Sequence, residues 1–352
     1  MSIYELLAIM ALLLAFLKDY IRNSRLLAAF FILILTIVAA IRDLSVGTDT
    51  DGYYDAFISA TTVDSLRTSA DEPLFALYTY LCQQYLNYDW FMLINYGIMI
   101  LSFLWVAFKK STNLPLSVFI FITCGFYLGS FNGMREYIAT AITFVALYVL
   151  ESEIEKKNRL FFLLTIIATL IHNTGLLVLL VYFIRNRDIP NRIQLTIVVS
   201  SFIIGFFLSD YFWSFIPSFV SDVGRLGKYL EYEEGSGGRT LITNLGVNIM
   251  FLFIMYLMDK DRQRSVFYKA YFVSMIIFNL VGSMNVLTRI TNNLAIAQIV
   301  IIPIVLSQTK IPIFKYGLLI LVLAYSISRF YLRELSNPDI LPYIIRPNIE
   351  FF

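Results

Sequence analysis

Residues 160–184 have the sequence LFFLLTIIATLIHNTGLLVLLVYFI, which is apolar except for the break His172-Asn173-Thr174-Gly175. A transmembrane helix needs about 20 apolar residues, so this stretch is long enough for one crossing. The break favours a second interpretation, in which a broken or re-entrant helix pair enters the membrane and returns to the same side. Non-helical backbone at membrane depth requires protein or a water-filled cavity around it, so the break predicts a polar cavity nearby. A kink without a functional role is the alternative.

The whole chain has the composition of a membrane protein. It is 59% hydrophobic and 15% charged, with a mean hydropathy of +0.73. The segment 73–87 is short and mixed in polarity, and we expect an interfacial helix there. The fold class is therefore an all-α polytopic membrane protein, compatible with a GT-C-like arrangement, in which residues 1–352 form a single multi-span domain. About ten further segments have nearly the length and composition of transmembrane helices: 3–17, 26–41, 90–108, 114–131, 134–150, 193–208, 241–258, 266–284, 289–307 and 311–330.

The distribution of Lys and Arg predicts the orientation, because positive residues concentrate on the cytoplasmic side of a membrane. If 73–87 lies at the interface and 160–184 returns, 17 of the 27 Lys and Arg residues face the cytoplasm. A single crossing at 160–184 gives 15, and an additional crossing at 73–87 gives 13. The first arrangement is preferred. It places both termini outside, together with the loops 42–72 and 209–240 and the tail 331–352.

Four arginines depart from this rule at the outer ends of predicted helices. Arg42 ends the span 26–41, whereas Arg135, Arg239 and Arg289 each open a span after polar or glycine-containing sequence. The start of a helix attracts anions through its free N–H groups, and a guanidinium adds a permanent, forked donor suited to phosphate. We expect these arginines to bind phosphate groups. Arginines that only anchor helix ends to lipid headgroups are the alternative.

Acidic residues and the single histidine lie on the same predicted side. The acidic loop after Arg42 carries Asp43, Asp49, Asp51 and Asp55, Glu72 directly precedes the segment 73–87, and His172 lies at the break. A partly desolvated carboxylate, or an imidazole, can have a pKa in the working range of a general base. Each of these residues is therefore a candidate base for a hydroxyl group, and the spacing does not choose among the acids. Solvated loop acids and a packed histidine at a helix junction are the alternatives.

Composition excludes two classes of function. One histidine, and two cysteines that both lie inside apolar runs, exclude a multi-histidine or a cysteine metal site. The net charge of +2 leaves no basic domain for nucleic acid. We expect neither a metal nor another cofactor, and no nucleic-acid partner.

Four motifs in a characteristic order carry a resemblance to a known family. They are VGTDTDGYYDAF after Arg42, EPLF at 72–75, FNGMREYIATAITF at 131–144 and IHNTGLLVLLVYF at 171–183. Together they resemble the EpsG family of polytopic bacterial proteins, which is related to the Wzy O-antigen and capsule polymerases. The motifs cover residues 1–184, and the second half of the chain agrees mainly in its alternation of spans and outer loops.

The resemblance implies a metal-independent glycosyltransferase of the bacterial inner membrane. Such an enzyme joins oligosaccharide repeat units carried on undecaprenyl pyrophosphate at the outer, periplasmic face, with membrane lipid and a chain-length regulator protein as further partners. The family motif maps onto Arg42, Asp49, Tyr53, Glu72, Arg135 and His172. The expected catalytic residues are then Asp49, Glu72, His172 and Arg135. The expected substrate and pyrophosphate contacts are Arg42, Tyr53, Asn132, Arg135, Asn173, Arg239 and Arg289, of which Arg239 and Arg289 follow from the topology alone.

Two other classes of function use similar residues. A flippase or other transporter for lipid-linked oligosaccharides would also need cations, but it should carry charge near the bilayer midplane and show related halves. Here the charges cluster at one surface and no two-fold repeat is found. A membrane O-acetyltransferase would use a histidine, and the sequence shows no acid close to His172 in the chain to pair with it.

Overall fold

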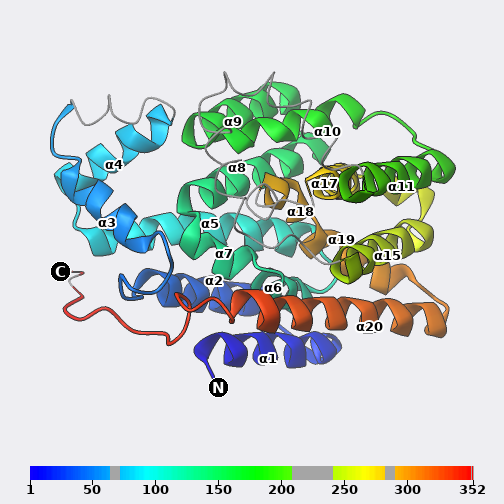
Figure 1. Ribbon diagram of the computed structural model, residues 1–352, viewed down its shortest axis with the longest axis horizontal. Coiled ribbons are helices and arrows are strands. Elements are labelled where there is room, and N and C mark those ends of the chain that lie inside the picture. Colours follow the sequence, from blue (N-terminus) through cyan, green and yellow to red (C-terminus); the bar gives the residue numbers. More distant parts are fainter. Residues whose placement is uncertain (64–71, 208–240, 282–289, 350, 352) are drawn as a thin grey trace.

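A computed structural model describes residues 1–63, 72–207, 241–281, 290–349 and 351, and these residues form helices and loops without a β-strand. Figure 1 shows the helices packed in a single bundle. The main helices are α1 (Ile3–Phe16), α2 (Ser24–Ala40), α3 (Thr50–Ser59), α4 (Pro73–Tyr85), α5 (Tyr88–Lys110), α6 (Leu114–Thr123), α7 (Phe126–Asn132), α8 (Met134–Glu151), α9 (Lys157–Ile171), α10 (Val178–Ile184), α11 (Asn191–Phe207), α15 (Leu241–Leu257), α17 (Val266–Leu280), α18 (Asn292–Ala295), α19 (Gln298–Gln308) and α20 (Pro312–Arg329).

Polar residues at the helix starts explain where many of the apolar helices begin. The side chains of Ser2, Asn23, Asn87, Asn113 and Ser265 each accept a hydrogen bond from a backbone N–H in the first turn of the following helix. Such caps satisfy donors that have no partner within the helix. Most of the predicted spans therefore correspond to helices with bounds that differ by only a few residues.

Two helices in the described part of the chain are long and apolar enough to cross a membrane, Tyr88–Lys110 and Pro312–Glu334. A third is added if the bent pair α6 and α7 forms one span. The other apolar helices are shorter, so about ten crossings remain a prediction from the sequence. Large apolar side chains point outward from several helices, as in Leu13 (59% exposed), Leu33 (61%) and Ile320 (65%), and lipid would cover such faces.

Two helices, α6 and α7, occupy the predicted span 114–131. The chain bends by 41° between α6 and α7. Gly125 at the bend has φ of +77°, and a Cβ there would lie 2.2 Å from Glu334 Oε1 and 2.8 Å from Arg329 Nη2. Glycine is required because only a residue without a side chain allows both this backbone conformation and the close approach of the Arg329–Glu334 pair.

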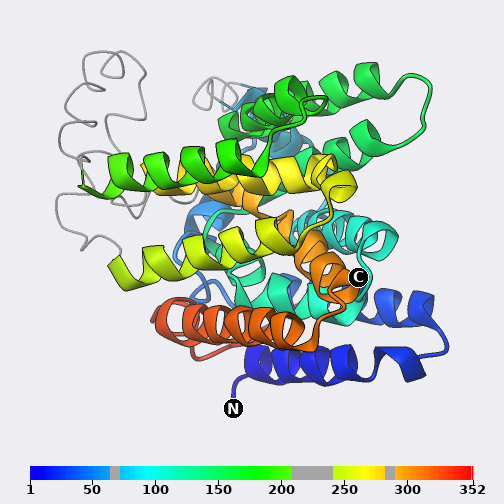
Figure 2. The ribbon, with the colours of Figure 1, turned by 90° about the vertical axis from the view of Figure 1, so that its right-hand side faces the viewer.

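The centre of the bundle consists of α5, α6 and α8. Every residue of α6 is buried, and α8 packs between α5 and α9. Figures 1 and 2 both show α1 and α20 side by side along one edge of the bundle. Tyr331, just beyond α20, donates a hydrogen bond to Glu5 of α1 at 2.8 Å, so the start of α1 and the end of α20 are joined along this edge.

Helix ends that were predicted to be cytoplasmic meet at one end of the bundle. Asn113 donates to the carbonyl of Ala15 at 3.0 Å, and Lys110 forms an ion pair with Glu151 at 2.9 Å. Glu151 also accepts from the backbone N–H of Val266. These contacts bring together the ends of α1, α5 and α8 and the starts of α6 and α17, which agrees with the predicted alternation of sides.

The segment 160–184 doubles back at its break. After α9 the chain forms a short 3₁₀ helix, η3 (Asn173–Leu177), and returns as α10. Tyr182 of α10 stacks on Phe161 of α9, with ring centroids 5.2 Å apart and planes 19° apart. Residues near the two ends of the segment are thus neighbours. This is the geometry of the returning helix pair and not of a single continuous helix.

The loop after α2 and the C-terminal tail lie together at the end of the bundle that carries α3 and α4 (Figure 1). The backbone N–H of Gly47 donates to Asp339 O at 2.6 Å, and that of Asp43 donates to Ile344 O at 2.8 Å. Helix α4 has 13 residues and spans about 20 Å, which is too short to cross a bilayer. It packs against α3, α5 and α9, so its length fits the predicted interfacial position.

Candidate functional site

A buried carboxylate joins two of the predicted site residues. Glu72 precedes Pro73 at the start of α4, and its side chain is 3% exposed. Its Oε2 forms an ion pair with Nη1 of Arg135, the second residue of α8, and its Oε1 lies 3.6 Å from Nε2 of His172. Residues from three separate motifs therefore meet at one carboxylate.

His172 is held by the turn in which it lies. It ends α9, and its Nδ1 is 2.7 Å from Thr174 Oγ1 and 3.4 Å from the backbone nitrogen of Thr174. Because the Thr174 N–H points at Nδ1, the tautomer with hydrogen on Nε2 is favoured, and that hydrogen faces Glu72. The polar break thus directs the imidazole toward the carboxylate.

Gly175 allows this turn to lie directly on α9. A Cβ at position 175 would be 2.8 Å from the carbonyl carbon of Ala168 and from the backbone nitrogen of Thr169. Both atoms belong to the backbone of α9, and carbon contacts are normally at about 3.5–4.0 Å. The glycine of the break is therefore explained by close packing inside the helix pair.

A cavity of about 490 Å³ lies beside Arg135. Its walls come from the end of the first loop and α3, from α4, and from Arg135 itself, and they include Asp49, Tyr53 and Phe75. The guanidinium carbon of Arg135 lies 5.8 Å from the ring centroid of Tyr53 and 5.9 Å from that of Phe75. The side chain of Arg135 is 37% exposed, so one part of it is fixed by Glu72 while another is accessible from the cavity.

Tyr53 and Asp49 have different environments in the cavity walls. Burial raises the pKa of Tyr53 to about 12, although Arg135 acts in the opposite direction. The Tyr53 hydroxyl therefore stays protonated at physiological pH, and it accepts the backbone N–H of Arg135 at 3.5 Å. Asp49 is exposed at the start of α3 and lines the cavity. Of the three bases expected from the resemblance, Asp49 is the one that lines this cavity; Glu72 and His172 do not.

Arg42 occupies a different environment from the one expected. It is 0% exposed, and its guanidinium donates to the carbonyls of Val46 and Ala39 and to Thr50 Oγ1. It also lies 4.7 Å from the ring centroid of Tyr96. The chain turns back over the end of α2, and Arg42 satisfies carbonyls at this turn. It does not line the cavity, and we leave it out of the proposed phosphate contacts.

Of the remaining predicted contact residues, the structure describes Asn132 and Asn173. Asn132 accepts the backbone N–H of Thr48 at 2.7 Å, so it supports the loop that carries Asp49. Asn173 is exposed at the start of η3. Arg239 and Arg289 lie outside the described residues.

The sequence model of the EpsG family matches residues 25–345, which include Asp49, Glu72, Arg135 and His172. The chain belongs to the EpsG family. EpsG proteins are a family of Wzy-like polymerases, and membership indicates a polymerase-like role in polysaccharide biosynthesis. No match was found among curated proteins or among solved structures.

The structure of this EpsG protein adds a residue that sequence reasoning missed. Asp339 Oδ2 accepts a hydrogen bond from Thr48 Oγ1 at 2.7 Å. Thr48 lines the cavity next to Asp49. The two partners are 291 positions apart, and no motif or spacing connects the C-terminal tail with the first loop.

The fold gives His172 an acidic neighbour, as a membrane O-acetyltransferase would need. The sequence offered no acid next to His172, but the fold brings Glu72 to it at 3.6 Å. The EpsG match, rather than the lack of a histidine–acid pair, now favours the polymerase class. Among the described residues, no group of three or more His, Cys, Asp or Glu side chains could hold a metal ion. A metal-independent reaction stays a prediction.

Proposed function

We propose that this EpsG protein joins oligosaccharide repeat units carried on undecaprenyl pyrophosphate, at the outer face of the bacterial inner membrane and without a metal ion. The observation that carries the proposal is the cavity of about 490 Å³ whose walls contain both Arg135 and Asp49. A permanent cation and a carboxylate are the two groups that this reaction needs. The volume lies within the usual range of about 300–1,000 Å³ for ligand sites.

The proposed reaction is a glycosyl transfer with diphosphate as the leaving group. The Asp49 carboxylate removes the proton from an acceptor hydroxyl, and that oxygen forms a bond to C1 of the donor sugar. The bond between C1 and the diphosphate oxygen breaks, and its electron pair leaves with undecaprenyl diphosphate. Arg135 stabilises the negative charge that develops on this leaving group. Asp49 then releases its proton to water.

Glu72 and His172 are assigned as positioning residues. Glu72 is buried and bonds Arg135 on one oxygen while facing His172 with the other. A guanidinium held in this way is preorganised, so it does not have to reorient when charge develops. Tyr53, whose ring lies under Arg135, provides an aromatic wall for a sugar.

The test is polymer synthesis by purified protein in liposomes that contain an undecaprenyl-pyrophosphate-linked repeat unit. Arg135→Ala should lower the rate by about 10²–10³, because one preorganised donor to a developing charge is lost. Asp49→Asn should lower it by about 10²–10⁴, because the base is lost. The matched control is Asp55→Asn, since Asp55 is an exposed acid on the same helix and is not part of the cavity wall. Wild-type rates for both site variants would refute the assignment.

Two further experiments test the class of function and whether the reaction needs a metal ion. A deletion strain should accumulate single lipid-linked repeat units at the outer face, whereas accumulation at the inner face would indicate a flippase. Polymer synthesis should persist in the presence of a chelator. Loss of polymer with chelator, restored by added divalent cation, would contradict the metal-independent reaction.

A further inference from the structure

A second cavity lies far from the first, where α10 connects to α11. It has a volume of about 490 Å³, and residues 187–192 line it together with the segment between α15 and α17 and the start of α17. In Figure 1 this connection lies on the right, whereas α3 and α4 lie on the left. The proposed sidedness of the protein places the second cavity at the cytoplasmic surface of the membrane.

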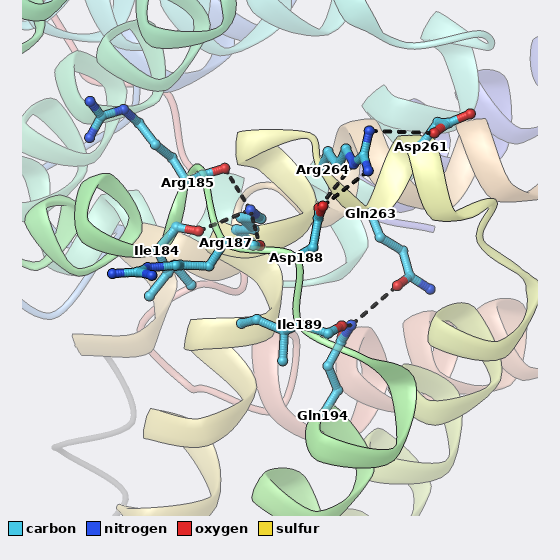
Figure 3. A network of polar contacts seen from close by, with 10 residues as sticks. Ile184, Arg185, Arg187, Asp188, Ile189, Gln194, Asp261, Gln263 and Arg264 are labelled. Carbon is cyan, nitrogen blue, oxygen red and sulfur yellow. Dashed lines mark hydrogen bonds and ion pairs between the residues drawn. The ribbon is translucent and has the colours of Figure 1, made fainter.

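The frame of this cavity is firmly held. The ammonium group of Lys269, which is 4% exposed as a residue, donates to the carbonyls of Ile184, Arg185 and Arg187 at 2.9, 2.5 and 2.7 Å. Figure 3 shows these three bonds converging on one nitrogen. All three donors of Lys269 are used, so this residue fixes the connection and has none left for a ligand.

The cavity floor is polar and fully hydrogen-bonded. Gln194, which is 3% exposed, donates to Ile189 O at 2.7 Å and to Gln263 Oε1 at 3.1 Å (Figure 3). Its own Oε1 accepts the hydroxyl of Tyr268 at 2.6 Å. These groups satisfy one another, and the frame therefore persists without a bound ligand.

The cavity walls carry excess positive charge. Arg264 forms a forked pair with Asp188, with N–O distances of 2.9 and 3.0 Å, and in the described part of the chain Asp188 is the one acidic side chain in the wall. The side chain of Arg187 points away from Gln194 and Gln263 in Figure 3. Arg192 and Lys260 also line the cavity, and among the described residues neither has an acidic partner. Two cations from different segments are thus available at one opening.

We infer that this second cavity binds the phosphate of an anionic phospholipid headgroup, with Arg192 and Lys260 as its cationic contacts. Basic pockets between helices at the cytoplasmic surface suit such headgroups. Helix α11 continues from the cavity with exposed apolar side chains, including Ile193 (50%), Leu195 (43%) and Val199 (41%). Acyl chains can lie along these side chains while the headgroup occupies the cavity, and a soluble anion would make no use of them.

The test is native mass spectrometry of the full-length protein in detergent, titrated with phosphatidylglycerol, with phosphatidylcholine or with inorganic phosphate. Phosphatidylglycerol should bind at least tenfold more tightly than phosphatidylcholine, which has a phosphate but no net charge. The double variant Arg192→Gln, Lys260→Gln should weaken this binding about 25-fold, because each cation near an anionic lipid contributes about fivefold. Lys260→Arg should retain binding.

The matched control is Arg22→Gln, Arg25→Gln, which removes two exposed cations from the same predicted side outside the cavity. It should bind phosphatidylglycerol within twofold of wild type. An equal loss in both double variants would indicate diffuse attraction and overturn the inference. So would displacement of the lipid by inorganic phosphate at millimolar concentration. Equal melting temperatures of the two double variants without lipid establish that both are folded. Polymer synthesis is not used as a readout here, so failure of the proposed function would leave the lipid-binding result unaffected.

Discussion

Replacement of Gly175 by alanine is the sharpest test of how the helix pair α9–α10 supports the site. The added Cβ would lie 2.8 Å from two backbone atoms of α9 and 2.9 Å from Ala168 Cβ. Since carbon contacts are normally at about 3.5–4.0 Å, the turn must move away from α9 by about 0.7–1.2 Å. Backbone cannot rotate aside as a side chain does, so the displacement is shared by the whole turn.

Two effects follow in Gly175→Ala. Overpacking of this size lowers the free energy of unfolding by roughly 1–3 kcal/mol. The turn also carries His172, whose Nε2 is 3.6 Å from Glu72, and a shift of this size changes that contact directly. Misplacement of a catalytic arrangement by about 1 Å can reduce a rate about 10²-fold. We therefore expect polymer synthesis to fall by about 10- to 100-fold.

The matched control for this variant is Gly246→Ala. Gly246 lies in α15, and a Cβ there meets nothing within 4 Å. Alanine is favoured over glycine inside a helix by about 1 kcal/mol, so this variant should be as stable as wild type or more so. Melting temperature in detergent and the initial rate of polymer synthesis are measured for both. If Gly175→Ala equals Gly246→Ala in both measurements, the close packing has no role in the site.

Three other substitutions separate the site from its surroundings. Glu72→Gln keeps the size of the side chain but removes the charge that holds Arg135, so polymer synthesis should fall at least tenfold with little change in melting temperature; a wild-type rate would exclude Glu72 from positioning. Arg42→Lys loses hydrogen bonds from the guanidinium that are worth about 1.5–3 kcal/mol each. The melting temperature should therefore fall while the rate per folded molecule is kept. A lower rate at an unchanged melting temperature would instead indicate that Arg42 is part of the site. Hydrogen bonds from Ser45 lower the pKa of Asp43. Its stabilisation is present above the unfolded pKa near 4 and is lost as pH falls through the lower folded value. Asp43→Asn should therefore lower the melting temperature at pH 7 but not near pH 2, and an equal decrease at both pH values would contradict this origin.

The helices could be predicted from the sequence because their signals are local. Asn87 begins α5 and two lysines end it, and the apolar residues between them have the length of a membrane span. The bend at Gly125 could not be predicted in the same way. The residues that lie against this bend are Arg329 and Glu334, which are far away in the sequence and approach Gly125 only when α20 packs on α6.

The polar break at 172–175 could be predicted from the sequence only in part. Its composition indicates a turn and a polar environment, but not which carboxylate His172 faces. Glu72 is 63 positions from Arg135 in the chain and precedes a different helix. Their meeting depends on how α4 packs on α9, which in turn packs on α8, and no spacing in the sequence contains that information.

Hydropathy and charge identified the helices, the two polar ends and a short set of unusual charged residues, because a bilayer selects residue types segment by segment. Those properties did not distinguish Arg42 from Arg135, which occupy similar positions at helix ends. Packing made one of them a buried hydrogen-bond donor to backbone carbonyls and left the other at a cavity wall. The reason is physical: the role of a charged side chain depends on which groups surround it, and these groups come from helices that meet only when the chain has folded.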